Sequence, residues 1–158
     1  TIEPFRDRQQ YEIRLAQDKD RNFVENIAKK NFSHDRFHQD PNIENSLADE
    51  IKRQWAGNFF LGKRGDAMVV ATANNYPVAF LLLLLAKKHS VIDLIAVSQK
   101  HRNKGLSKHM IGYALQNLSD RNRWIVGTQS TNIPSVRLYE SLGFQNIGSQ
   151  HVLHKHSI

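Results

Sequence analysis

The feature of this sequence that most constrains its fold is an apolar run followed at once by a basic, glycine-containing turn and a helical pattern. The apolar run covers residues 91–97, the turn covers residues 98–105, and the helical pattern covers residues 106–118. A strand that ends at such a turn directs backbone N–H groups and the positive end of the next helix toward an anion. Gly105 permits close approach of a ligand, and Arg102 can form a bidentate contact with a phosphate. We therefore expect a phosphate-bearing ligand at this turn.

The turn does not carry either of the two commonest nucleotide-binding motifs. Neither Gly-x-x-x-x-Gly-Lys-Ser/Thr nor Gly-x-Gly-x-x-Gly occurs in the chain. The turn instead reads Arg102-x-x-Gly105-x-Ser107, which resembles the Gln/Arg-x-x-Gly-x-Gly/Ala pyrophosphate loop of the GNAT superfamily of acyl-CoA-dependent N-acetyltransferases. Serine replaces the usual Gly or Ala at the last position, but it is also small. The resemblance implies acetyl-CoA as the acyl donor, with its pyrophosphate held by Arg102, Asn103, Lys104, Gly105, Leu106 and Ser107.

A second signature downstream strengthens this resemblance. Residues 124–129 are typical of a strand, and Asn132 follows as a good cap for the next helix. Tyr139 lies late in that helix, which ends at Gly143-Phe144. The GNAT superfamily has a similar order of strand, Asn, Tyr and Gly-Phe. Two motifs in the correct order are much harder to obtain by chance than either one alone.

The order of the other elements extends the resemblance across nearly the whole chain. Apolar residues recur at strand or helix spacing in each segment. Strands are expected at residues 11–15, 66–72, 77–86, 89–97 and 124–129, with one or two more at the C-terminus, and helices from a cap at Asp18, at 44–56, at 106–118 and from Ile133. This order implies an α/β fold of the GNAT type, with a mixed, largely antiparallel sheet of about six or seven strands flanked by about four helices.

The resemblance also implies how the acyl donor is held and activated. Tyr139 is expected to act as the general acid that protonates the departing thiolate. The strand before the basic turn separates from its neighbour in this family, so backbone groups there pair with the pantetheine arm. Asn132 is expected either to reach the cofactor or to serve only as a helix cap. The strand residues concerned are Ile95, Ala96 and Val97.

The general base is less constrained by the sequence. Asp93 is the one carboxylate within an otherwise apolar strand, and burial would raise its pKa toward a useful value. It is expected to be either the base or a structural hydrogen-bond acceptor. His34, His38 and Asp40, from the loop between the first two helices, are rival candidates. A chain of water molecules is a further alternative.

The same loop points to the acceptor. Its sequence, from Ser33 through Arg36, His38 and Asp40 to Pro41, resembles the Ser-Arg-Phe-His-x-Asp-Pro pattern of amino-sugar acetyltransferases related to dTDP-fucosamine acetyltransferase, with two residues inserted after the serine. The resemblance implies that Arg36 binds a diphosphate and that His38 or Asp40 binds a sugar hydroxyl. The expected acceptor is the primary amine of a nucleotide-linked amino sugar used for surface polysaccharides. A protein, a peptide, another small amine, or a non-catalytic acyl-CoA-binding role are the alternatives.

Length and charge restrict the partners. The 158 residues fit one N-acetyltransferase domain at residues 11–158, preceded by a linker or N-terminal extension at residues 1–10. The first residue is Thr1, which favours either a domain excised from a longer protein or loss of an initiator Met. The net charge is +7, but Lys and Arg are dispersed and no nucleic-acid motif accompanies them, so phosphates of a substrate and a cofactor are the expected partners.

Two further expectations concern the membrane and metals. The longest apolar run, residues 78–86, is far shorter than the about 20 residues of a membrane span, and no secretory signal begins the chain, which favours the cytoplasm. The chain has no Cys. The histidines of the loop lack a third ligand at a suitable spacing, and His151, His154 and His156 would alternate faces on a strand. No catalytic metal is expected.

Overall fold

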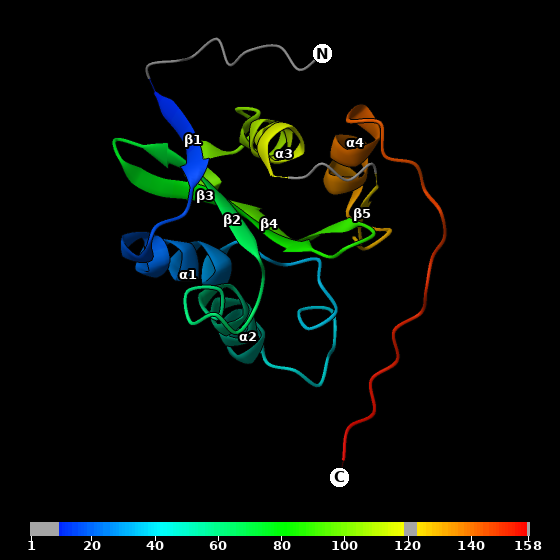
Figure 1. The fold of residues 1–158 in the computed structure, drawn as a ribbon. Helices are drawn as coiled ribbons and strands as arrows, with labels where there is room; N and C mark the ends of the chain where they lie inside the picture. Colours follow the sequence, from blue (N-terminus) through cyan, green and yellow to red (C-terminus); the bar gives the residue numbers. More distant parts are fainter. Residues whose placement is uncertain (1–9, 119–122, 158) are drawn as a thin grey trace.

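The computed structural model describes residues 10–118 and 123–157, which form a mixed sheet covered by helices on both faces (Figure 1). Residues 1–9, most of the expected linker, lie outside the described part of the chain. The five strands are β1 (Tyr11–Leu15), β2 (Ala67–Ala73), β3 (Tyr76–Leu85), β4 (Ser90–Val97) and β5 (Trp124–Val126). The α-helices are α1 (Arg21–Lys30), α2 (Asn45–Gly57), α3 (Leu106–Asn117) and α4 (Ile133–Ser141).

The strands follow one another across the sheet in chain order. The neighbours from β1 to β4 pair antiparallel, whereas β4 and β5 pair parallel. The parallel pair requires a crossover, and α3 provides it. Asn74 and Asn75 both have positive φ, as a tight hairpin turn demands, and they join β2 to β3 where the sequence predicts a hairpin.

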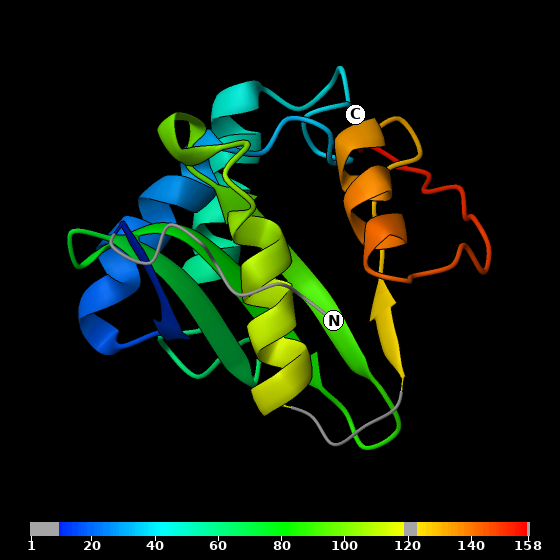
Figure 2. The ribbon, with the colours of Figure 1, turned by 90° about the horizontal axis from the view of Figure 1, so that it is seen from above.

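Alternation of side chains along β2 and β3 divides the core into two layers. Val69 and Leu81 face α3, whereas Val70 and Phe80 face α1 and α2. Because successive residues of a strand point to opposite faces, an all-apolar strand such as β3 must be covered on both sides. Figure 2 shows α3 lying across the face of the sheet and α4 standing over β5. Most of the largest fully buried side chains accordingly lie on β2 and β3.

The predicted number of strands, six or seven, was too high. The sheet has five strands, and residues 145–157 form no strand within the described part of the chain. Most of that segment is exposed, so it lacks the apolar face that would hold it against the sheet. The predicted strand at residues 124–129 ends at Val126, where Gly127 follows and weakens the strand. None of the described helices is both long and apolar enough to cross a membrane.

Candidate active site

The central feature of the site is the early end of the pairing between β4 and β5. Ser90 pairs with Trp124, and the last pair in the register is Ile92 with Val126. Beyond that pair, β4 continues to Val97 with β3 on one side only. Figure 2 shows β4 and the chain that follows β5 diverging beyond the last pair. One edge of the second half of β4 therefore has no partner strand in the described structure.

Backbone groups on this open edge can be assigned from the alternation of the strand. The N–H of Ser98 donates to the carbonyl of Val78 at 2.8 Å, so the backbone of Ser98 faces the β3 side. Alternate residues of a strand direct their backbone groups to opposite sides, which places Ala96 toward β3 and Ile95 and Val97 toward the open edge. Of the three strand residues predicted to meet the pantetheine arm, Ile95 and Val97 therefore present their N–H and C=O groups in the right direction.

A β-bulge interrupts β4 just before this open edge. Leu83 pairs with Ile92 and Leu82 pairs with Leu94, so Asp93 has no opposite residue in β3. A bulge re-aims the side chains that follow it. Here Ile92 belongs to the core layer under α3, whereas Leu94 belongs to the layer under α1 and α2. The bulge thus directs Asp93 toward α2.

The carboxylate of Asp93 is fully engaged there. Arg64 donates from Nη2 to Oδ1 at 2.6 Å and from Nε to Oδ2 at 2.7 Å, and Trp55 donates from Nε1 to Oδ2 at 2.9 Å. The Asp93 side chain is 9% exposed, and the Arg64 guanidinium lies 4.2 Å from the centre of the Trp55 ring. Both oxygens of this carboxylate therefore already accept hydrogen bonds from protein groups. The sequence left two roles open for Asp93, general base or structural hydrogen-bond acceptor. These contacts favour the structural role.

Arg64 and Asp93 provide a direct test of these two roles. We expect Arg64→Met and Asp93→Asn to lower the free energy of unfolding by about 1–3 kcal/mol each, because either change breaks charge-assisted bonds at a buried carboxylate. We also expect the two variants to lower kcat by similar, modest factors. Urea unfolding and steady-state kinetics measure both effects. A loss of about a hundredfold or more confined to Asp93→Asn would instead assign the base to Asp93.

The basic turn forms the predicted anion-binding geometry at the start of α3. Gly105 is the N-cap residue with φ 76°, and Asn103 has φ 60°, so both adopt left-handed conformations. The first backbone bond into the helix runs from the N–H of His109 to the carbonyl of Gly105 at 3.1 Å. The N–H groups of Leu106 and Ser107 precede that bond and point out of the helix end. This end suits a pyrophosphate.

Two cations of the turn, Arg102 and Lys104, differ in their surroundings. Arg102 donates from Nε to the carbonyl of Val97 at 3.3 Å and from Nη2 to Oδ1 of Asn31 at 3.1 Å. Its guanidinium thus ties the turn to the end of β4 and to the end of α1, and it is exposed. Lys104 is also exposed. Both charges lie beside the helix end, where an anion is favoured.

Tyr139 lies in α4 and reaches the core beneath α3. The residue is 6% exposed, and its ring packs edge-on against Phe144 with 5.6 Å between the ring centres. Burial raises the pKa of Tyr139 to about 12, so its hydroxyl keeps its proton throughout the neutral range. No hydrogen bond from this hydroxyl to another residue is found in the described part of the chain. The group is therefore a protonated phenol that has no hydrogen-bond acceptor among the described residues.

Asn132 has the capping role that its sequence position suggests. Its Oδ1 accepts from the backbone N–H of Ser135 at 3.4 Å, and Pro134 occupies the first turn of α4. The cap fixes where α4 begins relative to β5, and thereby the position of Tyr139. Contact of Asn132 with the cofactor stays a prediction.

The loop between α1 and α2 holds the residues predicted to bind the acceptor. His38 is 7% exposed, and its ring nitrogens lie 2.6 Å from Oδ2 of Asp35 and 2.9 Å from Oδ1 of Asp49. One nitrogen is therefore bonded within the loop and the other to α2. Arg36 is exposed and lies 4.8 Å over the ring of Phe37, with no ion pair to another described residue. Arg36 is thus the predicted acceptor residue best able to contact a ligand.

Asp40, the third predicted acceptor residue, meets the C-terminal segment. Its Oδ2 lies 2.5 Å from Nδ1 of His154 and 2.9 Å from Nε2 of His156, and its Oδ1 accepts from the N–H of Asn42 at 2.9 Å. The sequence did not predict the contact of Asp40 with these histidines, because no local pattern links a loop to residues over a hundred positions away. Arg64 and Trp55 were missed as partners of Asp93 for the same reason.

Comparison with known proteins identifies the family. Residues 21–144, well over half of the chain, match the acetyltransferase (GNAT) family. The chain belongs to this family. SpsD, a spore coat polysaccharide biosynthesis protein of Bacillus subtilis (strain 168), is 29% identical over 130 residues, which are 81% of this chain and 45% of SpsD. The chain therefore spans less than half the length of this relative.

Solved structures agree on the fold. The ribosomal-protein-S18-alanine N-acetyltransferase of Escherichia coli has a TM-score of 0.65 at 19% identity, covering 87% of this chain and 79% of that one. AAC(6')-Iy in complex with a bisubstrate analogue of CoA has a TM-score of 0.68 at 14% identity, covering 93% and 99%. The predicted GNAT fold and membership of the acetyltransferase family are confirmed.

Proposed function

We propose that this domain transfers the acetyl group of acetyl-CoA to the primary amine of a nucleotide-linked amino sugar, in the biosynthesis of a surface polysaccharide. The observation that carries the donor half is the open edge of β4 beside the N-terminus of α3. This arrangement offers the backbone groups of Ile95 and the N–H of Val97 to an extended chain, and the N–H groups of Leu106 and Ser107 to its phosphates. An acyl-CoA has an extended arm and a pyrophosphate in that order.

The chemistry follows from these positions. The acceptor amine attacks the thioester carbonyl, the carbon–sulfur bond breaks, and the amine loses a proton. A backbone N–H at the open edge of β4 stabilises negative charge that develops on the carbonyl oxygen. Tyr139 donates its proton to the departing thiolate, because a phenol protonated at neutral pH is suited to that role, and the phenolate then regains a proton from water. The amine proton passes to water, since Asp93 is held by Arg64 and Trp55.

The acceptor half of the proposal rests on a group of cations and aromatic rings next to Asp93. Lys52 and Arg64 lie 4.6 Å and 4.2 Å from the centre of the Trp55 ring, and Arg36 lies over Phe37. Arg36 is the exposed cation of this group and can bind a diphosphate, whereas Lys52 is buried and Arg64 is paired with Asp93. The rings offer flat surfaces for a base or a sugar. The similarity to SpsD, whose name refers to spore coat polysaccharide biosynthesis, supports a sugar acceptor.

Arg36 is the residue with which to test acceptor recognition. We expect Arg36→Ala to lower kcat/KM for an amino-sugar nucleotide about 10- to 100-fold and to leave the KM for acetyl-CoA unchanged, because a bidentate contact to phosphate is lost. Arg36→Lys should have an intermediate effect, since lysine keeps the charge but not the planar fork. Release of CoA measures the rate with each substrate varied in turn.

A matched control separates loss of this contact from loss of one positive charge. Lys88 is exposed in the turn between β3 and β4, and Lys88→Ala should leave both KM values unchanged. If Arg36→Ala weakens acetyl-CoA and spares the acceptor, the loop serves the cofactor. Turnover of a peptide N-terminus or a polyamine in preference to every amino-sugar nucleotide would replace the proposed acceptor. Binding of acetyl-CoA without turnover of any amine would indicate an acyl-CoA-binding module.

A further inference from the structure

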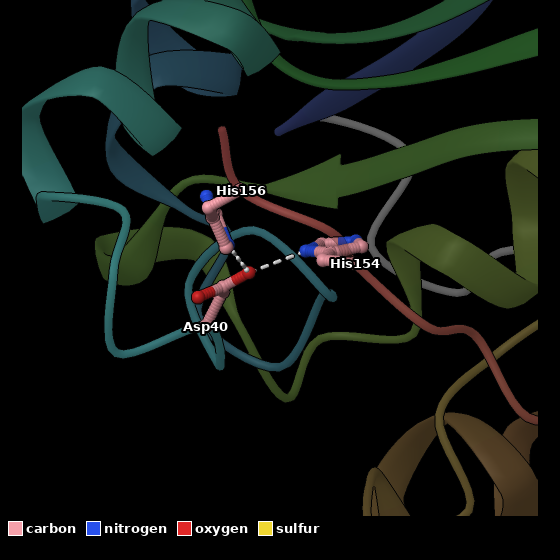
Figure 3. A group of neighbouring side chains, drawn as sticks. All are labelled: Asp40, His154 and His156. Atoms are coloured by element: carbon pink, nitrogen blue, oxygen red, sulfur yellow. Dashed lines mark hydrogen bonds and ion pairs between the residues drawn. The ribbon is translucent and has the colours of Figure 1, made fainter. Parts of the chain in front are cut away.

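Three side chains that the proposed reaction does not use converge where the C-terminal segment crosses the acceptor loop. They are Asp40 from the loop and His154 and His156 from the segment (Figure 3). One ligand atom from each lies within 4.8 Å of the others. Two imidazole nitrogens and a carboxylate oxygen form a donor set that transition metals favour.

Local structure orients each of these groups. The N–H of Asn42 donates to Oδ1 of Asp40 at 2.9 Å, which leaves Oδ2 directed at both imidazoles. His154 and His156 are two residues apart, so an extended backbone carries them on the same side. His154 presents its Nδ1 and His156 its Nε2, and these two nitrogens reach the same oxygen. A hydrogen bond to a metal-binding carboxylate fixes its orientation for an ion.

We propose that Asp40, His154 and His156 bind one Zn²⁺ ion, with water completing a tetrahedral set. Zinc–nitrogen and zinc–oxygen bonds of about 2.0–2.2 Å place ligand atoms roughly 3.3 Å apart in a tetrahedron. The present nitrogen–oxygen separations are 2.5 Å and 2.9 Å, so the ion requires a small opening of the cluster. His154 and His156 lie in a segment without helix or strand, which can move by that amount. Each imidazole then offers a lone pair in place of its shared proton.

The ion would fasten the C-terminal segment to the acceptor loop. Residues 145–157 have no strand pairing in the described structure, and His154 also lies near Phe37, with 6.2 Å between the ring centres. A metal bound by groups from both segments stabilises the folded arrangement over any state in which they separate. This inference concerns a structural site and is independent of the acetyl-transfer chemistry proposed above.

Metal titration tests the proposal on the intact chain. Protein stripped with EDTA is titrated with Zn²⁺ by calorimetry, and bound metal is counted by mass spectrometry after dialysis. We expect one Zn²⁺ per chain, and we expect Co²⁺ to give the intense visible absorption of a tetrahedral site. His154→Ala, His156→Ala and Asp40→Asn should each weaken Zn²⁺ binding at least about tenfold, because each removes a direct ligand.

His151→Ala is the matched control, because His151 lies in the same segment but outside the cluster. It should bind Zn²⁺ as the unmodified chain does. Circular dichroism confirms that each variant is folded, and all four positions lie outside the helices and strands. Two results overturn the proposal: no saturable binding of Zn²⁺ by the unmodified chain, or equal affinity in the His154→Ala, His156→Ala double variant.

Discussion

Replacing Tyr139 with phenylalanine is expected to lower kcat about a hundredfold to ten-thousandfold while the Kd for acetyl-CoA stays nearly unchanged. The ring of Tyr139 packs against Phe144 in the core, and phenylalanine preserves that packing. Only the hydroxyl is removed, and with it the proton donor for the departing thiolate. Steady-state rates of CoA release measure kcat, and calorimetry measures the affinity for acetyl-CoA.

Tyr113 offers a matched control for this substitution. It lies in α3 and packs against the same core layer as Tyr139, so Tyr113→Phe removes a hydroxyl of the same kind outside the proposed chemistry. We expect Tyr113→Phe to retain the unmodified kcat. A normal kcat in Tyr139→Phe would leave Tyr139 with a packing role alone, and equal losses in both variants would point to a general effect on the core.

The raised pKa of Tyr139 has a separate consequence for stability at alkaline pH. Burial raises the pKa from 10 in the unfolded chain to about 12 in the folded chain, so the folded state favours the protonated phenol. The unfolded chain therefore releases this proton first, and stability falls as the pH rises from about 10 to about 12. Tyr139→Phe should lose less stability over that interval, which urea unfolding at several pH values can measure.

The parts of the fold and site that follow from sequence are those with a local signature. The strand, glycine turn and helix around Gly105 could be predicted because one residue with positive φ at a helix end leaves a recognisable pattern. Asn132 and Tyr139 lie in a helix whose start and stop are both marked, by a cap and by Gly143 with φ 87°. The apolar runs at residues 66–72 and 77–86 likewise predicted strands, and both faces of β2 and β3 are buried.

The rest depends on tertiary contacts that no local pattern encodes. Arg64 reaches Asp93 across 29 positions of sequence, and the bulge that turns Asp93 toward it is visible only in the register of β3 and β4. His154 meets Asp40 across 114 positions. The missing C-terminal strands have the same cause, because a short segment of alternating pattern becomes a strand only where a partner edge and an apolar face accept it.

Gly105→Val is expected to abolish measurable acetyl-CoA binding, a loss of at least about a hundredfold in affinity, while the domain stays folded. Two physical effects act together. The φ of 76° is unfavourable for any residue with a Cβ, by about 1–2 kcal/mol and more for a β-branched one, so valine shifts the turn from its present shape. The branched side chain also stands where a pyrophosphate must approach the N–H groups of Leu106 and Ser107.

Steric overlap with other protein atoms does not cause the expected loss of acetyl-CoA affinity in Gly105→Val. A Cβ added at Gly105 would lie 3.5 Å from the ring of His109, an ordinary contact. Gly62 has a similar φ of 66° and nothing within 4 Å of an added Cβ, so Gly62→Val imposes comparable backbone strain away from the helix end. We expect Gly62→Val to reduce stability by a similar amount and to bind acetyl-CoA normally. Calorimetric titration of the two variants side by side therefore separates strain from ligand exclusion, and equal affinities would remove Gly105 from the cofactor site.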